Sequence, residues 1–449
     1  MTAMRDAREA DEPGAPAGLL APFIFTLRTK GAVGLATRVT TVAARFGPTS
    51  HIMRRRLGHM IDEAARLGFR PTCPITATVL ARNPDMVRAL ADRGMEIAVH
   101  GFRHNDHLAQ DASVQLREIE QAVATFRRWG IEPAGFRAPY LRADDGTRSA
   151  VRAVGLAYES DDAVVFDIAG LDDVGSNDAY RRATVMYDAQ PASTTTTRPS
   201  LDRGLVRIPV CIPDDEMLVD RLHLPDKVCG RAWCEILDVT HARGDLFTMQ
   251  VHPERFLKSV AGVRVVLNRA ASLGGIWTAR LDEIAQWWLA RDRCRIERRA
   301  VVQGSVTYAL VGDTRARMRL VGGSASAERQ SARTLTVSAD RLPAIAVARD
   351  VPATVRRFLE EDGYLVLTEP KVPCAVELSG TVDATDHIAL RRRVLSTPHA
   401  LLAIDRWPYG STSALALTGD IDALTIQDFA YRMRDNAHGA PSWITGAAT

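Results

Sequence analysis

Two aspartates follow an apolar run near the end of the chain, in ALALTGDIDALTIQDF (residues 414–429). Asp420 and Asp422 are separated by one residue, and a segment of helical character comes after them. Two carboxylates this close can divide the work of a hydrolytic site, because one can bind a metal ion while the other accepts a proton from water. Taken alone, the stretch fits a polar turn after a strand equally well.

Two histidines, His100 and His104, follow the apolar segment MEIAVH in the sequence HGFRH. Imidazoles four residues apart on a helical turn face the same side and can reach one metal ion. A carboxylate commonly completes such a pair, leaving a position for water. By itself HxxxH is also typical of surface histidines, so the prediction of a metal site depends on the aspartates meeting this pair.

Two more polar groups stand at the ends of apolar segments, Arg137 and Tyr140 in GFRAPY and His252 in FTMQVHP. An arginine can orient a carboxylate through forked hydrogen bonds, and a stiff Pro-Tyr turn can present a backbone N–H to a developing oxyanion. A histidine can protonate a leaving group near neutral pH. A surface arginine before a turn and a histidine capping a strand are the alternatives.

Alternating helical and strand-like patterns from about residue 50 to 288 must position these groups. Helices are predicted at HIMRRRLGHMIDEAARLGF, DMVRALADRG and VQLREIEQAVATFRRWG, each followed by or ending at a glycine. Strands are predicted at TATVL, MEIAVH and AGFRAPY. Repeated βα units predict an α/β sheet or barrel, in which strand ends are where sites are built.

The pattern changes near Asp292. From about 295 to 400, short alternating segments separated by Gly, Ser and Asp predict an antiparallel sheet or small sandwich, with one helix at PATVRRFLEEDG.

Composition narrows the class of protein. A chain of 449 residues with 46% hydrophobic residues can bury the cores of two or three domains. Lys plus Arg (57) nearly balance Asp plus Glu (54), which gives no case for a nucleic-acid partner. Six scattered cysteines without a CxxC pair argue against a zinc ribbon and a disulfide scaffold.

A cytoplasmic protein is expected. The first residues are polar, acidic and Pro/Gly-rich, unlike a secretory signal, and no run approaches the ~20 apolar residues of a membrane span. Residues 19–46 mix apolar and basic side chains without an acid. They predict an amphipathic helix that either packs on its own domain or lies peripherally on a membrane or a partner.

In order and spacing, MEIAVHGFRH, GFRAPY and FTMQVHP resemble the motifs of the NodB-type polysaccharide deacetylases, over roughly residues 50–290. The resemblance implies a metal-dependent hydrolase on a distorted (β/α) barrel. It implies a divalent metal, Zn²⁺ before Co²⁺ or Ni²⁺, on His100, His104 and Asp422. It also implies Asp420 as base, oriented by Arg137, with the Tyr140 N–H on the oxyanion and His252 as acid.

That family places its aspartate motif before the histidines, but the corresponding slot here, TTVAARFGPTSH, contains no acid. We therefore expect a circular permutation in which the C-terminus supplies the first barrel strand. This gives an N-terminal segment (1–48), a deacetylase-like barrel (49–293), an inserted β-rich accessory domain (294–400) and a returning strand and helix (401–449). The alternative, a second truncated deacetylase domain, is disfavoured because only 27 residues follow Asp422.

The sequence departs from the family pattern at two positions, with Gly419 in place of an aromatic residue and Asn105 in place of a proline. No tryptophan-bearing motif supports His252, and three aspartates are candidates for that support: Asp161, Asp214 and Asp215.

The expected function is removal of an N-acetyl or similarly small acyl group from an amino sugar in a polysaccharide, a glycoconjugate or a natural-product intermediate. Hydrolysis of another C–N bond, such as a formamide or cyclic amide, and a non-catalytic glycan-binding member are the alternatives. The oligomeric state stays open.

Overall fold

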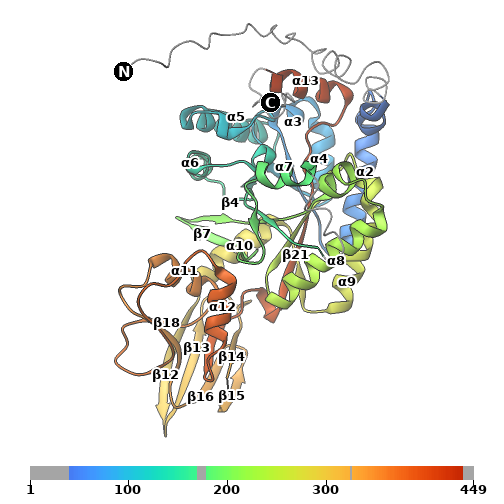
Figure 1. The fold of residues 1–449 in the computed structure, drawn as a ribbon. Helices are drawn as coiled ribbons and strands as arrows, with labels where there is room; N and C mark the ends of the chain where they lie inside the picture. Colours follow the sequence, from blue (N-terminus) through green and yellow to red (C-terminus); the bar gives the residue numbers. More distant parts are fainter. Residues whose placement is uncertain (1–39, 169–177, 324–325, 438–449) are drawn as a thin grey trace, which may run out of the picture.

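A large curled sheet with helices around it forms the main body of the molecule, and a β-rich segment lies at one end of it (Figure 1). The computed structural model describes residues 40–168, 178–323 and 326–437. Over these residues the sheet has 12 strands in the order β6-β5-β9-β10-β21-β1-β2-β3-β4-β8-β7, with β11 beside β21. All neighbours are parallel except β7 and β8. The sheet is a curled half-barrel of mixed α/β type.

The strands of this sheet are short and largely buried. They are β1 (Thr72–Ile75), β2 (Glu96–Val99), β3 (Gly135–Phe136), β4 (Tyr158–Glu159), β5 (Ala163–Val165), β6 (Gln190–Pro191), β7 (Ser200–Asp202), β8 (Leu205–Arg207), β9 (Val210–Ile212), β10 (Leu246–Gln250), β11 (Ile276–Thr278) and β21 (Ser413–Thr418).

The helices around the sheet include the three that the sequence predicts, found at α2, α4 and α5. The full set is α2 (His51–Ala65), α3 (Ala77–Arg82), α4 (Pro84–Asp92), η1 (His107–Ala109), α5 (Ala112–Arg128), η2 (Pro139–Leu141), α6 (Asp145–Ala153), α7 (Asp178–Met186), η4 (Glu216–Arg221), α8 (Asp226–Arg243), α9 (Phe256–Leu273), α10 (Leu281–Asp292) and α13 (Ile426–Ala437).

β21, the strand before the aspartate pair, lies in the middle of the sheet. It runs parallel to β10 from Leu246↔Ala414 to Gln250↔Thr418, and its other edge reaches β1 at Thr72↔Thr418. All six of its residues are buried, as expected for a parallel strand covered on both faces. A segment near the end of the chain therefore supplies an interior strand between β10 and β1, whose paired residues come 168 and 346 positions earlier.

One strand prediction was wrong. The segment TATVL was expected to be a strand, but the strand is the preceding TCPI (β1), and Ala77 begins helix α3. β1 is fixed by its parallel pairing with β2, and this tertiary pairing outweighs the β-propensity of Thr78 and Val79.

The β-rich segment is more varied than an antiparallel sheet with one helix. Its antiparallel sheet has the order β12-β13-β16-β15, β14 pairs with β20, and β17 lies between β18 and β19 in a parallel sheet. The bounds are β12 (Arg295–Val302), β13 (Ser305–Val311), β14 (Met318–Gly322), β15 (Ser326–Ser331), β16 (Thr334–Ser338), β17 (Leu342–Val347), α11 (Ala353–Glu361), β18 (Val366–Thr368), β19 (Cys374–Leu378), α12 (His387–Leu395), β20 (Ala400–Ile404) and η5 (Pro408–Gly410).

The second helix of this segment, α12, was missed because its inward face is only partly apolar. Leu390, Arg391 and Val394 are its buried residues, so an arginine interrupts the hydrophobic period on which the prediction relies.

The two ends of the described chain meet beside the sheet. Residues 40–46 are helical, and the Phe46 ring stacks on Phe429 of α13 with centroids 5.3 Å apart. The Ile426 N–H donates to the Gly47 carbonyl at 2.9 Å. The last residues of the predicted amphipathic helix thus pack on this protein, while residues 19–39 lie outside the described part. Within the described residues, no helix is long and apolar enough to span a membrane.

Candidate active site

The aspartate pair leaves β21 and continues along the edge of β1. The N–H groups of Gly419 and Ile421 donate to the carbonyls of Thr72 and Pro74 at 3.0 and 2.8 Å. A Cβ at position 419 would lie 2.7 Å from the Val251 carbonyl oxygen, so there is no space for the aromatic residue that the family pattern has. The extended path keeps the side chains of Asp420 and Asp422 on the same side of the strand.

The two histidines reach the same place from the end of β2. His100 and His104 do not lie on a helical turn, as the sequence argument assumed, but on a bend that begins at Gly101 with φ of 80°. A Cβ at Gly101 would approach the Arg103 carbonyl oxygen to 2.8 Å. Glycine therefore allows the chain to turn back, which brings His104 beside His100 without a helix.

The ligand atoms of His100, His104 and Asp422 converge within 4.8 Å of one another, and all three residues are buried. The Oδ1 atom of Asp422 lies 3.4 Å from Nε2 of His100 and 3.3 Å from Nε2 of His104. Tetrahedral ligands bound at about 2.1 Å are roughly 3.4 Å apart. The donor set and its spacing therefore fit a divalent cation such as Zn²⁺.

Neighbouring groups set the protonation states of these three side chains. His100 Nδ1 lies 2.7 Å from the Arg137 carbonyl; a carbonyl can only accept, so Nδ1 carries the proton and Nε2 is left as a ligand. Burial, followed by the charge of Arg432, lowers the pKa of His104 well below its usual value, which keeps it neutral. Burial opposes ionisation of Asp422, but the charge of Arg432 is the strongest opposing influence, and the pKa of Asp422 lies well below its usual range.

Two side chains, Arg137 and Gln250, donate hydrogen bonds to Asp420. The buried Arg137 donates from Nη1 to Asp420 Oδ1 and to Thr418 Oγ1, both at 3.0 Å. Gln250 Nε2 donates to Asp420 Oδ2 at 3.2 Å. The other side of the Arg137 guanidinium is fixed by Ser160, through its carbonyl at 3.0 Å and its Oγ at 2.8 Å. Asp420 is thereby oriented next to the histidine pair, with its Oδ2 atom 4.0 Å from His100 Nε2.

His252 lies across the same cleft and is paired with Asp215. Its Nδ1 is 2.6 Å from Asp215 Oδ1, and its backbone N–H donates to Asp215 Oδ2 at 2.8 Å. Burial disfavours the imidazolium, but the Asp215 carboxylate outweighs it and raises the pKa of His252 well above its usual value. Of the three aspartates considered from the sequence, Asp215 is the one that contacts His252.

The other two aspartates have different contacts. Asp214 accepts the Met217 N–H at 2.9 Å, and burial raises its pKa to about 7. Asp161 accepts the Ala138 N–H at 2.5 Å, which fixes the turn that leads to Tyr140. Tyr140 has φ of 62°, a left-handed conformation uncommon for a non-glycine residue, and its ring edge packs on His104 with centroids 4.6 Å apart.

Two residues of the site were not identified from the sequence, Gln250 and Arg432. Arg432, on α13, places Nη1 2.8 Å from Asp422 Oδ2 and so leaves Oδ1 toward the histidines. Gln250 is the last residue of β10, two residues before His252. Its position at a strand end is the sequence feature that could have identified it as a site residue. Arg432 lies ten residues after Asp422 in the sequence, and it contacts Asp422 only because α13 packs beside the site.

A cleft of about 1210 Å³ contains the whole arrangement. Its walls include His100, His104, His252, Asp420, Asp422, Tyr140, Gln250 and Arg432. The three residues whose ligand atoms converge, the carboxylate of Asp420 and the histidine with a raised pKa thus face one open volume. This arrangement can bind a cation, accept a proton on one side of a substrate and donate one on the other.

Comparisons with known proteins agree with the motif resemblance. Residues 58–158 match the family model for polysaccharide deacetylase. A peptidoglycan deacetylase-like protein, FGM2, from Gibberella zeae is 33% identical over 78 residues, 17% of this chain and 23% of the relative. The match thus spans less than a quarter of that relative's length.

Two solved structures show a partial likeness. A protein from Mycobacterium smegmatis, described as a polysaccharide deacetylase of provisional assignment, is 17% identical with a TM-score of 0.43, covering 64% of this chain and 94% of the other. The family 4 carbohydrate esterase from Streptomyces lividans, in complex with acetate, is 17% identical with a TM-score of 0.32, covering 49% and 83%.

Proposed function

We propose that the protein, whose residues 58–158 match the family model for polysaccharide deacetylase, is a metal-dependent hydrolase that removes an acetyl or similarly small acyl group from the nitrogen of an amino sugar. The observation that carries this proposal is the arrangement around Asp420. A carboxylate held by Arg137 lies beside a His-His-Asp ligand set, and the His252–Asp215 pair faces the same cleft.

His100, His104 and Asp422 would hold the cation. When bound, a divalent cation such as Zn²⁺ supplies a Lewis acid that polarises the acyl carbonyl and lowers the pKa of water. The chain's own residues move the protons. Asp420, kept in place by Arg137 and Gln250, takes a proton from the attacking water.

The other groups act on the substrate. The Tyr140 N–H, presented by the strained turn after Pro139, stabilises the negative charge on the acyl oxygen. His252, with Nδ1 engaged by Asp215, has Nε2 left to donate a proton to the departing amine. Its raised pKa keeps that proton available at neutral pH.

We also propose that the family's first barrel strand is supplied here by β21, as in a circular permutation. Three observations support this. β21 fills the position between β10 and β1, and it carries the two aspartates that the segment TTVAARFGPTSH lacks. The Phe46–Phe429 contact brings residues near the two ends of the described chain together, which is the geometry that permutation requires.

The function is tested by measuring acetate release from N-acetylated amino sugars by the wild-type protein and by Asp420→Asn, with metal content measured on both. We expect Asp420→Asn to keep its metal and to lose turnover by about 10²–10⁴-fold, the usual contribution of a general base. Metal binding without acetate release from any N-acetylated sugar by the wild type would point to another C–N bond instead. Unchanged turnover in Asp420→Asn would remove this residue from the reaction.

A further inference from the structure

A second cleft, of about 1050 Å³, lies between the large sheet and the β-rich segment. Helix α11 contributes Thr354, Arg357 and Phe358 to its wall, and α12 contributes His387. The sheet side contributes Asp161 and Arg207. The β-rich segment therefore forms part of the wall of this cleft.

The second cleft adjoins the first. Five residues line both volumes, two after β3 and three at the end of α7: Leu141, Arg142, Val185, Met186 and Tyr187. These shared residues place the second cleft next to the cleft that contains the His-His-Asp cluster. The volumes of the two clefts together exceed the roughly 300–1,000 Å³ that a small ligand needs.

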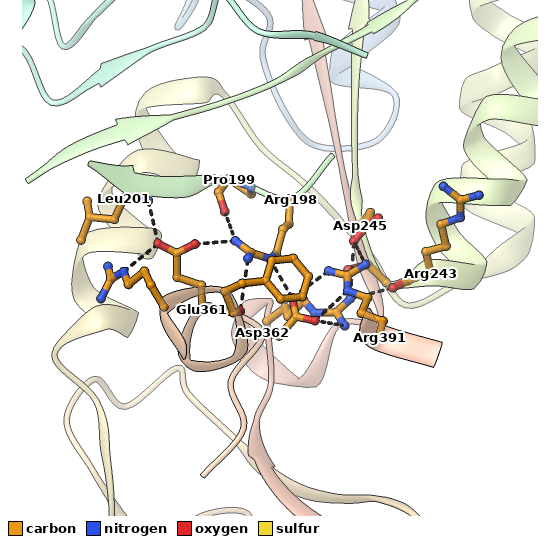
Figure 2. Close-up of polar contacts among 12 residues, drawn as sticks. Arg198, Pro199, Leu201, Arg243, Asp245, Glu361, Asp362 and Arg391 are labelled. Atoms are coloured by element: carbon orange, nitrogen blue, oxygen red, sulfur yellow. Dashed lines mark hydrogen bonds and ion pairs between the residues drawn. The ribbon is translucent and has the colours of Figure 1, made fainter. Parts of the chain in front are cut away.

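The far wall of the second cleft is held rigidly against the sheet (Figure 2). Arg198 donates to Glu361 and Asp362 of the β-rich segment, both at 2.7 Å. Arg391 bridges two carboxylates, because it donates to Asp362 at 2.6 Å and to Asp245, just before β10, at 2.7 Å. All five side chains are less than 10% exposed. A buried charge that lost its partner would be costly, so α11 and α12 are fixed in place before any ligand arrives.

The wall is polar but close to neutral. Arg207 faces Asp162 at 2.6 Å, Arg148 faces Glu159 at 2.9 Å, and Arg357 faces Glu361 at 2.9 Å. Because each guanidinium already has a carboxylate, the wall offers donors beside acceptors and no unmatched positive charge for a phosphate. Neighbouring donors and acceptors suit the hydroxyl groups of a neutral sugar.

Asp161 adds an unused polar atom. Its side chain is 3% exposed, its Oδ1 accepts the Ala138 N–H, and its Oδ2 has no hydrogen-bond partner among the described residues. Buried polar atoms are nearly always paired, so an unpaired one at a cleft wall is a position for a ligand hydroxyl or a water.

We propose that the second cleft binds further sugar residues of the chain whose amino sugar lies at the His-His-Asp cluster. This inference rests on the proposed function and specifies its substrate class. The substrate is a neutral, hydroxyl-rich oligosaccharide or polymer, and the β-rich segment is the part that recognises its length.

The test compares N-acetylglucosamine oligomers of two and six residues as substrates of the wild type and of Thr354→Trp, which fills the cleft. The wild type should show kcat/KM at least about tenfold higher for the hexamer, and Thr354→Trp should bring the ratio close to one. Arg356→Trp, on the exposed side of α11 outside the cleft, is the matched control and should keep the wild-type ratio. An equal ratio in the wild type and Thr354→Trp would overturn the proposal.

A binding measurement separates this proposal from the proposed function. Hexamer affinity is measured by calorimetry on Asp420→Asn, with and without Thr354→Trp, and the second substitution should weaken binding about tenfold. Failure of Asp420→Asn to bind the hexamer, or equal affinity of both variants, contradicts the distal site. Hexamer binding that depends on Thr354, without acetate release by the wild type, contradicts the deacetylase activity and leaves the distal site standing.

Discussion

At the scale of single residues, the site assigns opposite tasks to two carboxylates. Asp422 directs Oδ1 to two imidazoles and Oδ2 to Arg432, so it is suited to bind a cation. Asp420 is held by Arg137 and Gln250 and is left to accept a proton. In the proposed mechanism, these two settings make one carboxylate the metal ligand and the other the base.

The pairing of His252 with Asp215 predicts the pH dependence of the reaction. The carboxylate raises the pKa of His252, so the acid form that donates the proton persists above the usual pKa of about 6.5 and is lost only as the pH rises through the raised value. In Asp215→Asn, the carboxylate that most strongly opposes the effect of burial is removed, and the pKa of His252 falls. The alkaline limb of kcat/KM against pH should therefore move to lower pH by at least about one unit.

The control for this profile is Asp214→Asn, which removes a carboxyl group that does not bond to His252, and its shift should be smaller. An alkaline limb that stays in place in Asp215→Asn would mean that His252 is not the proton donor.

The sequence allowed us to predict those site residues that follow apolar strands. His100, His104, Arg137, Tyr140, His252, Asp420 and Asp422 all contribute to or adjoin one cleft. Arg432 and the support of His252 by Asp215 could not be chosen in advance. The position of Arg432 depends on where α13 packs, and that of Asp215 on the loop before η4. The conformational propensities of single residues do not predict either arrangement.

At the scale of elements, β21 decides whether the site exists. Its apolar run and the two aspartates after it predicted a buried strand, and the strand is buried throughout. The sequence could not say which strands it would join, because parallel pairing between β21 and β10 links residues about 170 apart and leaves no local signal. The same limit explains the wrong strand at TATVL, where pairing chose the neighbouring segment.

Removing a buried side chain from β21 should leave a cavity and lower the stability of the fold. Leu417 is 1% exposed and belongs to the hydrophobic core around the sheet, so Leu417→Ala should lower the free energy of unfolding by about 2–5 kcal/mol. Urea denaturation followed by circular dichroism measures this loss. Leu395→Ala, at a side chain 44% exposed, should change it by no more than about 0.5 kcal/mol. Similar small losses in both variants would show that β21 is not packed as an interior strand.

At the scale of the whole molecule, the two ends of the described chain complete one unit. Residues 40–46 and α13 pack together and both line the cleft, through Phe46 and Arg432 among others. The β-rich segment stands between β21 and the rest of the sheet in sequence, yet a buried ion-pair network fixes it to the sheet in space (Figure 2).

The proposed permutation predicts that the order of the segments can be restored. A chain in which residues 411–437 precede residue 40 through a flexible Gly/Ser linker of about ten residues, and which ends at residue 410, should fold and bind metal like the wild type. Circular dichroism and metal analysis measure the outcome. The same rearranged chain with Asp422→Ala is the control and should lose the metal. A folded rearranged chain without metal would argue against the permutation.

The most direct test of the account is the metal content of the purified protein and of Asp422→Ala, measured by elemental analysis after incubation with Zn²⁺ and desalting. Asp92→Ala, at an exposed position at the end of α4, is the control. We predict about one divalent ion per chain in the wild type and the control, and its loss in Asp422→Ala, because the aspartate after β21 completes the site of His100 and His104. Equal metal in all three proteins, or none in any, would contradict the account.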